Sequence, residues 1–308
     1  MVIIYNINEL NAPYPNLITT IGNFDGVHLG HQALMGRVIQ LARDTSGQPG
    51  LITFEPHPAS VLGHGDPPPL ITPFSQKMDL IQALGIQVVF CLTFDRALAK
   101  MSPEDFVKDI LVTKIGVRHV VIGYDYNFGR WGQGNAALLK DLGEQWGFGV
   151  DALDPVLVND APVKSTTVRQ LIIEGNVEDI PAYLGRHYQV GGRVVHGFAR
   201  GGRQLGFPTA NVDPEDKLLP RPGVYAVRAQ VGHEPVNGVA NIGYNPTFGA
   251  NSLTLEVYLL DFNRDIYDKE MTVDFLARLR DEKKFSSPDE LITQIKADVA
   301  QARTILSA

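Results

Sequence analysis

The sequence contains a single cysteine, Cys91, in 308 residues. A disulfide framework and a cysteine-based zinc site are therefore excluded, and we expect a protein of the reducing cytoplasm. Cys91 lies within the apolar run VVFCLTF, which is typical of a small core residue rather than of a catalytic thiol.

An excess of basic charge is also missing. The net charge is −7 and no basic run occurs, so we expect no nucleic-acid partner. No apolar run approaches the roughly 18 residues that a membrane helix needs, and MVIIYNINEL lacks the regions of a secretory signal. We therefore expect no membrane partner either. The hydrophobic share of 44% is typical of a globular protein.

Two common phosphate-binding signatures are absent as well. Neither G-x-x-x-x-G-K-[ST] nor G-x-G-x-x-G occurs, which excludes a P-loop and a dinucleotide fingerprint. A nucleotide site in this chain must therefore be built in another way.

The patterns that are present divide the chain into two predicted domains, 1–184 and 185–308. In the first, the apolar runs LITTIG, GLITFEP, IQVVFCLTF and HVVIGY alternate with helical patterns. This alternation predicts an α/β domain with a parallel sheet, whose ligands bind outside the carboxyl ends of the strands. In the second, short alternating strands such as VYAVRAQV predict a small barrel of half-buried strands. A helix in SPDELITQIKADVAQARTIL follows it.

The stretch GNFDGVHLGH follows the first apolar strand and opens a helical pattern. His28 and His31 are three residues apart, so they share one face of the first helical turn. That turn also exposes unpaired N–H groups and the positive end of the helix dipole, while Gly30 adds little bulk. Imidazoles can donate to phosphate oxygens. The pattern favours a triphosphate site, and the alternative is two surface histidines at an ordinary helix start.

The stretch GRQLGFPTANV is the most distinctive feature of the second half. Thr209 and Asn211 point to the same side of an extended segment and offer neutral oxygens that suit Mg²⁺. Glu256 lies on the polar face of LTLEVYLL, where it could accept the proton of an alcohol during phosphoryl transfer. The alternatives are a Pro-Thr turn before a strand and an exposed acid on a half-buried strand.

These motifs carry a resemblance to a known family. GNFDGVHLGH resembles the nucleotide-binding motif of the H-x-G-H nucleotidylyltransferases, and with TFEPHP, GYDYNFG and KSTTVR it resembles the adenylyltransferase half of the bacterial bifunctional riboflavin kinase/FAD synthetases. GGRVVHGFARGGRQLGFPTANV, NIGYNPTFG, LEVYLLDF and LRDEKKF follow the riboflavin kinase half in order, and P-T-A-N is its signature. The resemblance covers nearly the whole chain, from about residue 18 to the C-terminal helix.

The resemblance implies an α/β Rossmann-like nucleotidylyltransferase domain followed by an antiparallel six-stranded β-barrel with a C-terminal helix. It implies that the second domain phosphorylates riboflavin to FMN with ATP. The first would then adenylylate FMN to FAD with a second ATP and release pyrophosphate. Mg²⁺ is the implied cofactor, and riboflavin, FMN, FAD and ATP are the implied partners. Two coupled active sites also lead us to expect a homo-oligomer.

The resemblance further implies a role for each matching residue. The implied catalytic residues are Glu256, His28 and His31. The implied nucleotide-binding residues are Gly22, Phe24, Asp25, Gly26, His28, Gly30, His31, Ser165, Thr166, Arg169, Gly202, Thr209 and Asn211. The implied metal ligands are Thr209 and Asn211. The implied flavin-binding residues are Phe54, Pro56, Pro58, Asp125, Asn127, Asn245, Pro246, Thr247 and Arg280, the last favoured over Arg278.

The sequence departs from the family pattern at a few positions. Lys164 stands where the family has serine, Tyr126 and Asn127 stand where it often has Phe and Arg, and Asp268 replaces a glycine. KSTTVR is also typical of a helix N-cap, with Ser165 or Thr166 opening the helix. Two further functions therefore stay open: a riboflavin kinase with weak or lost adenylyltransferase activity, and a non-catalytic flavin-binding protein.

Overall fold

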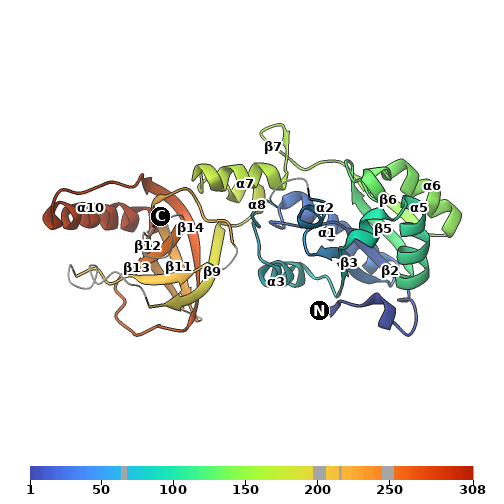
Figure 1. The fold of residues 1–308 in the computed structure, drawn as a ribbon, viewed down its shortest axis with the longest axis horizontal. Helices are drawn as coiled ribbons and strands as arrows, with labels where there is room; N and C mark the ends of the chain where they lie inside the picture. The colour runs from blue at the N-terminus through green and yellow to red at the C-terminus, as the bar shows by residue number, and fades with distance from the viewer. Residues whose placement is uncertain (64–67, 197–205, 215–216, 233, 245–252, 308) are drawn as a thin grey trace. The chain divides into compact units, whose positions relative to one another are not determined.

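The computed structural model describes residues 1–63, 68–196, 206–214, 217–232, 234–244 and 253–307 (Figure 1). The chain folds into two compact units, Met1–Lys164 and Ser165–Ala308. None of the helices in these described ranges is long and apolar enough to cross a membrane.

The first unit is built on a six-stranded parallel sheet with the order β1-β4-β3-β2-β5-β6. Its strands are β1 Val2–Ile4, β2 Leu17–Ile21, β3 Gln48–Glu55, β4 Val88–Thr93, β5 Val117–Gly123 and β6 Gly149–Leu153, with a small hairpin of β7 Leu157–Val158 and β8 Ala161–Pro162. The four predicted apolar runs are the four central strands of this sheet. Cys91 is buried in β4, and burial raises the pKa of its thiol to about 11, as expected of a core residue.

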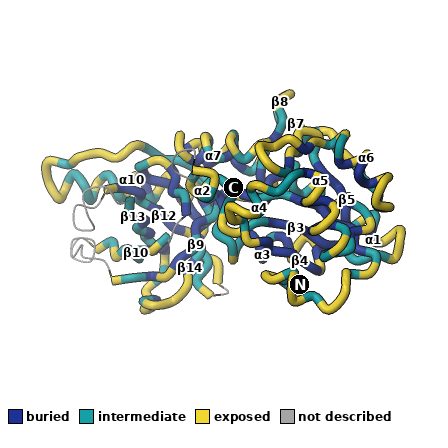
Figure 2. Tube along the Cα trace, turned by 45° about the vertical axis from the view of Figure 1, so that its right-hand side comes forward, coloured by how far each residue is buried: buried dark blue, intermediate teal, exposed yellow. Residues whose placement is uncertain are grey.

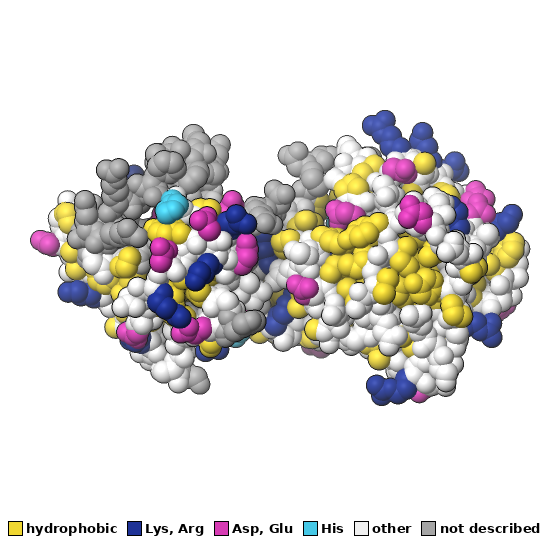
Figure 3. Space-filling model, turned by 90° about the horizontal axis from the view of Figure 1, so that it is seen from below, with side chains coloured by type: hydrophobic (Ala, Val, Ile, Leu, Met, Phe, Trp, Pro, Cys, Tyr) yellow, Lys and Arg dark blue, Asp and Glu magenta, His cyan; other side chains and the backbone are white. Residues whose placement is uncertain are grey.

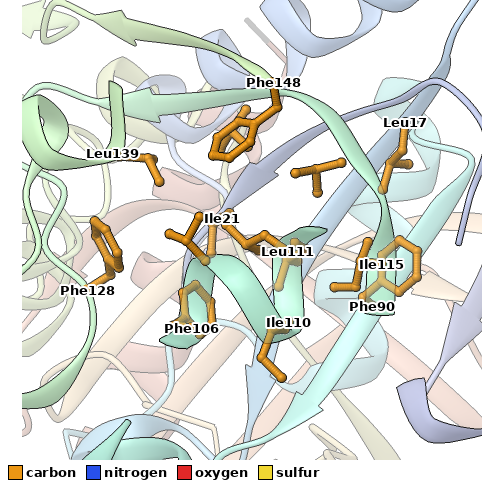
Figure 4. Close-up of a cluster of buried hydrophobic side chains, with 14 of the residues drawn as sticks. Leu17, Ile21, Phe90, Phe106, Ile110, Leu111, Ile115, Phe128, Leu139 and Phe148 are labelled. Atoms are coloured by element: carbon orange, nitrogen blue, oxygen red, sulfur yellow. The ribbon is translucent and has the colours of Figure 1, made fainter. Parts of the chain in front are cut away.

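Helices cover both faces of the sheet, which is why its central strands are apolar on both sides. The helical segments of this unit are η1 Ile7–Glu9, α1 Leu29–Asp44, α2 Pro58–Leu62, α3 Phe74–Leu84, α4 Arg96–Lys100, α5 Pro103–Asp105, the π-helical η2 Phe106–Ile115, η3 Arg130–Gly132 and α6 Ala136–Trp146. Helices α1 and α3 pack on one face of the sheet. Segments η2 and α6 pack on the other, where Phe106 and Leu111 meet strand residues such as Ile21 and Phe90 (Figure 4).

The order of the strands explains where the motifs lie. The chain steps outward from β2 to β3 and β4, then crosses to β5 and β6 on the other side of β2. Ligands of such sheets bind outside the carboxyl ends of the strands, at this reversal of strand order. The ends of β2, β3 and β5 lead directly into GNFDGVHLGH, PHP and YDYNFG. The three motifs therefore follow the same edge of the sheet.

The second unit is a closed barrel with the strand order β10-β13-β12-β11-β14-β9. All of its neighbours pair antiparallel, which confirms the predicted six-stranded barrel. The strands are β9 Tyr188–Val195, β10 Ala210–Asp213, β11 Gly223–Val231, β12 Glu234–Tyr244, β13 Leu253–Leu259 and β14 Glu270–Arg280. The helices are α7 Ser165–Glu174, α8 Pro181–Leu184 and α10 Pro288–Leu306. The predicted C-terminal helix is thus confirmed as α10.

The prediction that VYAVRAQV is a half-buried strand is wrong for the first part of β11. Val224 and Ala226 lie on the face opposite Tyr225 and Val227, yet all four side chains are buried. The reason is that α10 covers this outer face, where Ala302 and its neighbours pack against Ala226. Figure 2 colours the described residues by how far each is buried.

Candidate active sites

The turn between β2 and α1 carries the first candidate site. Three of its residues have a positive φ: Phe24 at 54°, Gly26 at 87° and Val27 at 42°. Glycine adopts this conformation freely, but it is strained for a bulky or β-branched side chain. Contacts from elsewhere must therefore stabilise the turn.

A segment nearly fifty residues further along the chain supplies these contacts. The carboxylate of the buried Asp25 accepts the backbone N–H groups of Ile71 and Thr72, each at 3.0 Å. The hydroxyl of Thr72 accepts the backbone N–H of Gly26 at 3.0 Å. The contacts described for Asp25 thus fit a role in shaping the turn, and its contact with a nucleotide stays a prediction. Sequence reasoning missed Thr72, since nothing in the local pattern links it to Asp25.

His28 and His31 lie together at the start of α1. His28 is the N-cap residue, and its Nδ1 accepts the backbone N–H of His31 at 3.3 Å. The two rings stack, with their centroids 3.5 Å apart and an interplanar angle of 18°. Phe24 meets the His31 ring edge-on at 5.2 Å. The spacing therefore predicted their shared position correctly.

Burial keeps both imidazoles neutral at neutral pH. It lowers the pKa of His28 to about 4, against the opposing effect of the Asp25 carboxylate. It also lowers the pKa of His31 well below its usual value, with help from the neighbouring His28 and Lys77. Because Nδ1 of His28 accepts a hydrogen bond, its proton is on Nε2, which is left as a donor. The pair can thus donate hydrogen bonds to phosphate oxygens without carrying charge.

Two predicted nucleotide residues are glycines for reasons of packing. A Cβ atom on Gly30 would lie 3.1 Å from the His28 ring. A Cβ atom on Gly22 would lie 3.1 Å from the Phe24 ring. A side chain at either position would push on an aromatic ring of the site.

The predicted flavin residues follow β3 and β5. Phe54 meets Phe94 edge-on at a centroid distance of 5.7 Å. Pro56 follows a cis peptide bond, and Pro58 opens the short helix α2. Asn127 donates from its side-chain amide to the carbonyl of Asp125 at 2.8 Å. Their contacts with a flavin stay predictions.

The two departures near this site differ in their surroundings. The ammonium of Lys164 pairs with the carboxylate of Asp125 at 3.1 Å, and both side chains are about half exposed. Tyr126 stacks on Phe128, and burial raises the pKa of its hydroxyl. Lys164 is therefore a surface ion-pair partner of a predicted flavin residue, whereas Tyr126 packs internally.

Helix α7 begins at Ser165, directly after Lys164. Ser165 thus opens this helix, as KSTTVR predicted, and Thr166 follows in its first turn. Arg169 follows one turn later. Their approach to phosphates stays a prediction. Gly202, Asn245, Pro246 and Thr247 lie outside the described residues.

The second candidate site lies on the outside of the barrel. Asn211 on β10, Glu256 on β13 and Asn241 on β12 are direct register partners across three neighbouring strands. Leu255 and Val257, on either side of Glu256, are buried within the barrel. Glu256 therefore points outward, on the face predicted from the alternation.

Glu256 is half-buried rather than a freely exposed acid. The hydroxyl of Thr209, just before β10, donates to its carboxylate at 3.4 Å. Burial raises the pKa of Glu256, and the hydrogen bond from Thr209 opposes this shift. A carboxyl group in such surroundings has a higher proton affinity than one in water.

A cavity of about 420 Å³ adjoins Glu256. Its lining includes Thr209, Asn241, Tyr258, Arg280 and Asp298, so barrel strands and α10 both contribute. Sequence reasoning missed Asn241, although the alternation in VANIGY places it on the outer face of β12.

The two candidate arginines of β14 have different positions. Arg280 lines the cavity and forms a bidentate pair with the buried Asp298 of α10, at 2.8 to 3.1 Å. Arg278 instead pairs with Asp281 at 2.6 Å and is not part of the lining. The geometry thus agrees with the preference for Arg280, and its contact with a flavin stays a prediction.

Together these features define a class of protein. A parallel α/β unit with paired imidazoles at a helix start, and a closed barrel with a carboxylate beside an outer cavity, indicate a two-domain transferase that uses nucleotides.

The comparisons with known proteins name the family. The riboflavin kinase family model matches residues 184–306, and the FAD synthetase family model matches residues 11–167. A Bacillus subtilis bifunctional riboflavin kinase/FMN adenylyltransferase is 37% identical over 290 residues, covering 92% of this chain and 91% of that protein. The Escherichia coli K12 protein of the same name is 36% identical over 301 residues, covering 97% and 95%. The chain therefore belongs to the family of bifunctional riboflavin kinase/FMN adenylyltransferases, and it is an enzyme with both activities.

A solved structure shares the whole fold. The crystal structure of a Streptococcus pneumoniae protein, described as a macrolide-efflux protein, matches with a TM-score of 0.89 and 31% identity over 98% of both chains. The family membership favours the enzyme over the non-catalytic flavin-binding alternative.

Proposed function

We propose that Glu256 is the general base of the riboflavin kinase reaction. The attacking hydroxyl of riboflavin loses its proton to the Glu256 carboxylate and forms a bond to the γ-phosphorus of ATP, while the bond to ADP breaks. The observation that supports this role is the half-buried carboxylate, with its raised pKa, beside a cavity on the barrel. A base of increased proton affinity is better suited to this transfer than an exposed carboxylate.

We propose Thr209 and Asn211 as the protein's ligands for Mg²⁺. Both offer neutral oxygens, and Asn211 is the register partner of Glu256. Mg²⁺ binds readily through a few protein oxygens together with substrate phosphates, so this donor set fits the ion. Among the described residues, no three His, Cys, Asp or Glu side chains are grouped as a metal site. When bound, the ion would offset charge on the phosphates.

We propose that the first domain uses His28 and His31 to bind the triphosphate of a second ATP. A phosphate oxygen of FMN attacks the α-phosphorus, and the bond to pyrophosphate breaks, so no side-chain nucleophile is needed. The neutral imidazoles and the first N–H groups of α1 are placed to donate to phosphate oxygens. Ser165, Thr166 and Arg169 are proposed as further phosphate contacts.

The remaining assignments are also proposals. We propose the domain boundary between residues 184 and 185, where α8 ends and near where the riboflavin kinase model begins. This boundary assigns α7 and α8 to the first domain, although both helices belong to the second compact unit. We further propose a cytoplasmic location, in line with the lone cysteine, and self-association of the enzyme.

The experiment that tests these roles starts separately from riboflavin and from FMN. The full chain is incubated with ATP and Mg²⁺, and FMN and FAD are separated by chromatography. We expect FMN and then FAD from riboflavin, and FAD with pyrophosphate from FMN. A chain that makes FMN but no FAD would overturn the proposal for His28 and His31.

A further inference from the structure

Lys77 is a buried lysine that has no role in the two reactions as proposed above. It lies on α3, and only 7% of the residue is exposed. Its ammonium group donates to the backbone carbonyl of Asn23 at 3.2 Å. Within the described chain, no carboxylate oxygen lies within 4.0 Å of it. Burying an ammonium group without a close anion costs folding free energy, which suggests that Lys77 has a function.

The nearby carboxylates offset this charge only in part. Asp25 and Glu55 both raise the pKa of Lys77, but burial lowers it by more. Asp25 already accepts hydrogen bonds from Ile71 and Thr72. The ammonium group of Lys77 therefore lies in a poorly solvated place, where an anionic ligand beside it would stabilise its charged form.

The position of Lys77 links it to the first candidate site. Its acceptor, Asn23, belongs to the turn that presents His28 and His31. Lys77 is also close enough to lower the pKa of His31. The two histidines are neutral, so they bring hydrogen-bond donors but no charge to a polyphosphate. Lys77 is the buried positive group beside them.

We propose that Lys77 is a further residue of the adenylyl-transfer site, where its positive charge stabilises the triphosphate and the departing pyrophosphate. This inference rests on the adenylyltransferase role proposed for His28 and His31. The pyrophosphate gains negative charge as its bond to the α-phosphorus breaks. In a site of low dielectric, a fixed charge a few ångströms away acts strongly on such a change.

The first test replaces Lys77 with a neutral side chain of similar length, Lys77→Met, in the full chain. Inorganic pyrophosphate is the probe, because of the two reactions only adenylyl transfer releases it. The reverse reaction, FAD with pyrophosphate to FMN with ATP, is measured over a range of salt concentrations. We expect kcat/KM for pyrophosphate to fall by about 10²-fold and its salt dependence to become weaker. Riboflavin phosphorylation in the same sample should be unchanged.

The matched control is Thr72→Val, which removes a contact with the same turn but no charge. It should leave the salt dependence for pyrophosphate as in the wild type. Unfolding of the first unit is followed by the fluorescence of Trp131 and Trp146, the chain's two tryptophans, which both lie in that unit. If Lys77→Met matches Thr72→Val in pyrophosphate kinetics and salt dependence, Lys77 only stabilises the turn and the proposal is overturned.

A second variant covers the case in which Lys77→Met unfolds the first unit. Lys77→Gln keeps a donor for the Asn23 carbonyl but lacks the charge, so it should show the same loss and the same weaker salt dependence. Wild-type kinetics in Lys77→Gln would refute the charge role. A wild-type chain that makes no FAD from FMN would instead refute the adenylyltransferase role itself, which separates the two failures.

Discussion

Burial shifts the pKa of ionisable groups at both candidate sites, but in opposite directions. In the α/β unit, burial lowers the pKa of His28 and His31, so two bases stay neutral at neutral pH. On the barrel, burial raises the pKa of Glu256, so an acid gains proton affinity. Desolvation disfavours the charged form in both cases. These opposite shifts agree with the proposed roles, phosphate binding at the first site and proton acceptance at the second.

The two sites also differ in how their residues are brought together. The histidines come from one helical turn, and a segment nearly fifty residues away stabilises that turn. Glu256 is aligned by strand register with Asn211 and Asn241, and α10 closes the cavity beside it. Because the two sites are assembled from different elements, we expect that each can be disabled without the other.

Hydrophobic side chains also gather in a patch on the face of the first unit drawn in Figure 3.

The largest effect is expected from Glu256→Gln. Loss of a general base costs typically 10² to 10⁴ in rate, so FMN formation from riboflavin should fall by about 10³-fold. FAD formation from FMN should be unchanged, because Glu256 and the two histidines belong to different units. Chromatography of reactions started from riboflavin and from FMN measures both. Loss of both activities would show that the sites are not independent.

The reverse pattern is expected from His28→Ala and from His31→Ala. Removal of one donor to a developing charge costs about 10² to 10³ in rate, so FAD formation should fall by this factor. FMN formation should be unchanged. His28→Asn is the matched control for folding, since asparagine is also a favourable N-cap residue. FAD formation that survives both alanine changes would contradict the phosphate role.

Local sequence patterns predicted those features of the two units that depend on residues close together in the chain. The central strands were predicted from continuous apolar runs, and the shared position of His28 and His31 followed from their spacing. Strands β1 and β6 were missed, because they lie at the edges of the sheet and are only partly buried. Short edge strands have weak apolar patterns.

Contacts between distant segments could not be predicted in this way. Thr72 and Lys77 contact the turn at 23–27, and Asp298 of α10 pairs with Arg280 of β14 in the lining of the cavity. No periodicity records such pairings, since they depend on how helices pack on a sheet or barrel. The burial that shifts the pKa of His28 and Glu256 is set by the same packing.

The neutrality of His28 can be tested through stability. Its pKa is about 4 in the folded chain and 6.5 in its usual state, so between these values the unfolded chain binds more protons. The contribution of His28 to the stability of the first unit should therefore rise as pH increases from about 4 to 6.5, and stay constant above that. The pKa difference corresponds to roughly 3 kcal/mol.

His28→Asn removes this titration and keeps the N-cap. The difference in free energy of unfolding between wild type and His28→Asn should thus depend on pH only below about 6.5. Denaturant unfolding followed by tryptophan fluorescence reports on the first unit alone. A constant difference between pH 4 and 6.5 would mean that His28 is charged when folded, which would remove the contrast with Glu256.

A smaller effect is expected at Lys164. Its ion pair with Asp125 is about half exposed, and such pairs contribute little. Lys164→Ser restores the residue usual in the family and should change kcat/KM for FMN adenylylation by less than about fivefold. The control is the riboflavin kinase rate of the same variant. A gain of more than tenfold would mean that Lys164 weakens the adenylyltransferase, and would support the kinase-dominated alternative.

The smallest effect is expected at Asp268, in the second unit. This residue has a φ of 61°, which explains why glycine is usual there, and its backbone N–H donates to the carbonyl of Val194 at 2.9 Å. Asp268→Gly removes the strain of a non-glycine residue in the left-handed backbone region, but it increases the conformational entropy of the unfolded chain. The two effects on the free energy of unfolding nearly cancel. We expect a change in unfolding free energy of less than about 1 kcal/mol and unchanged FMN and FAD formation. Urea unfolding followed by circular dichroism measures the first, and a large loss of kinase activity would show that this turn contributes to the barrel site.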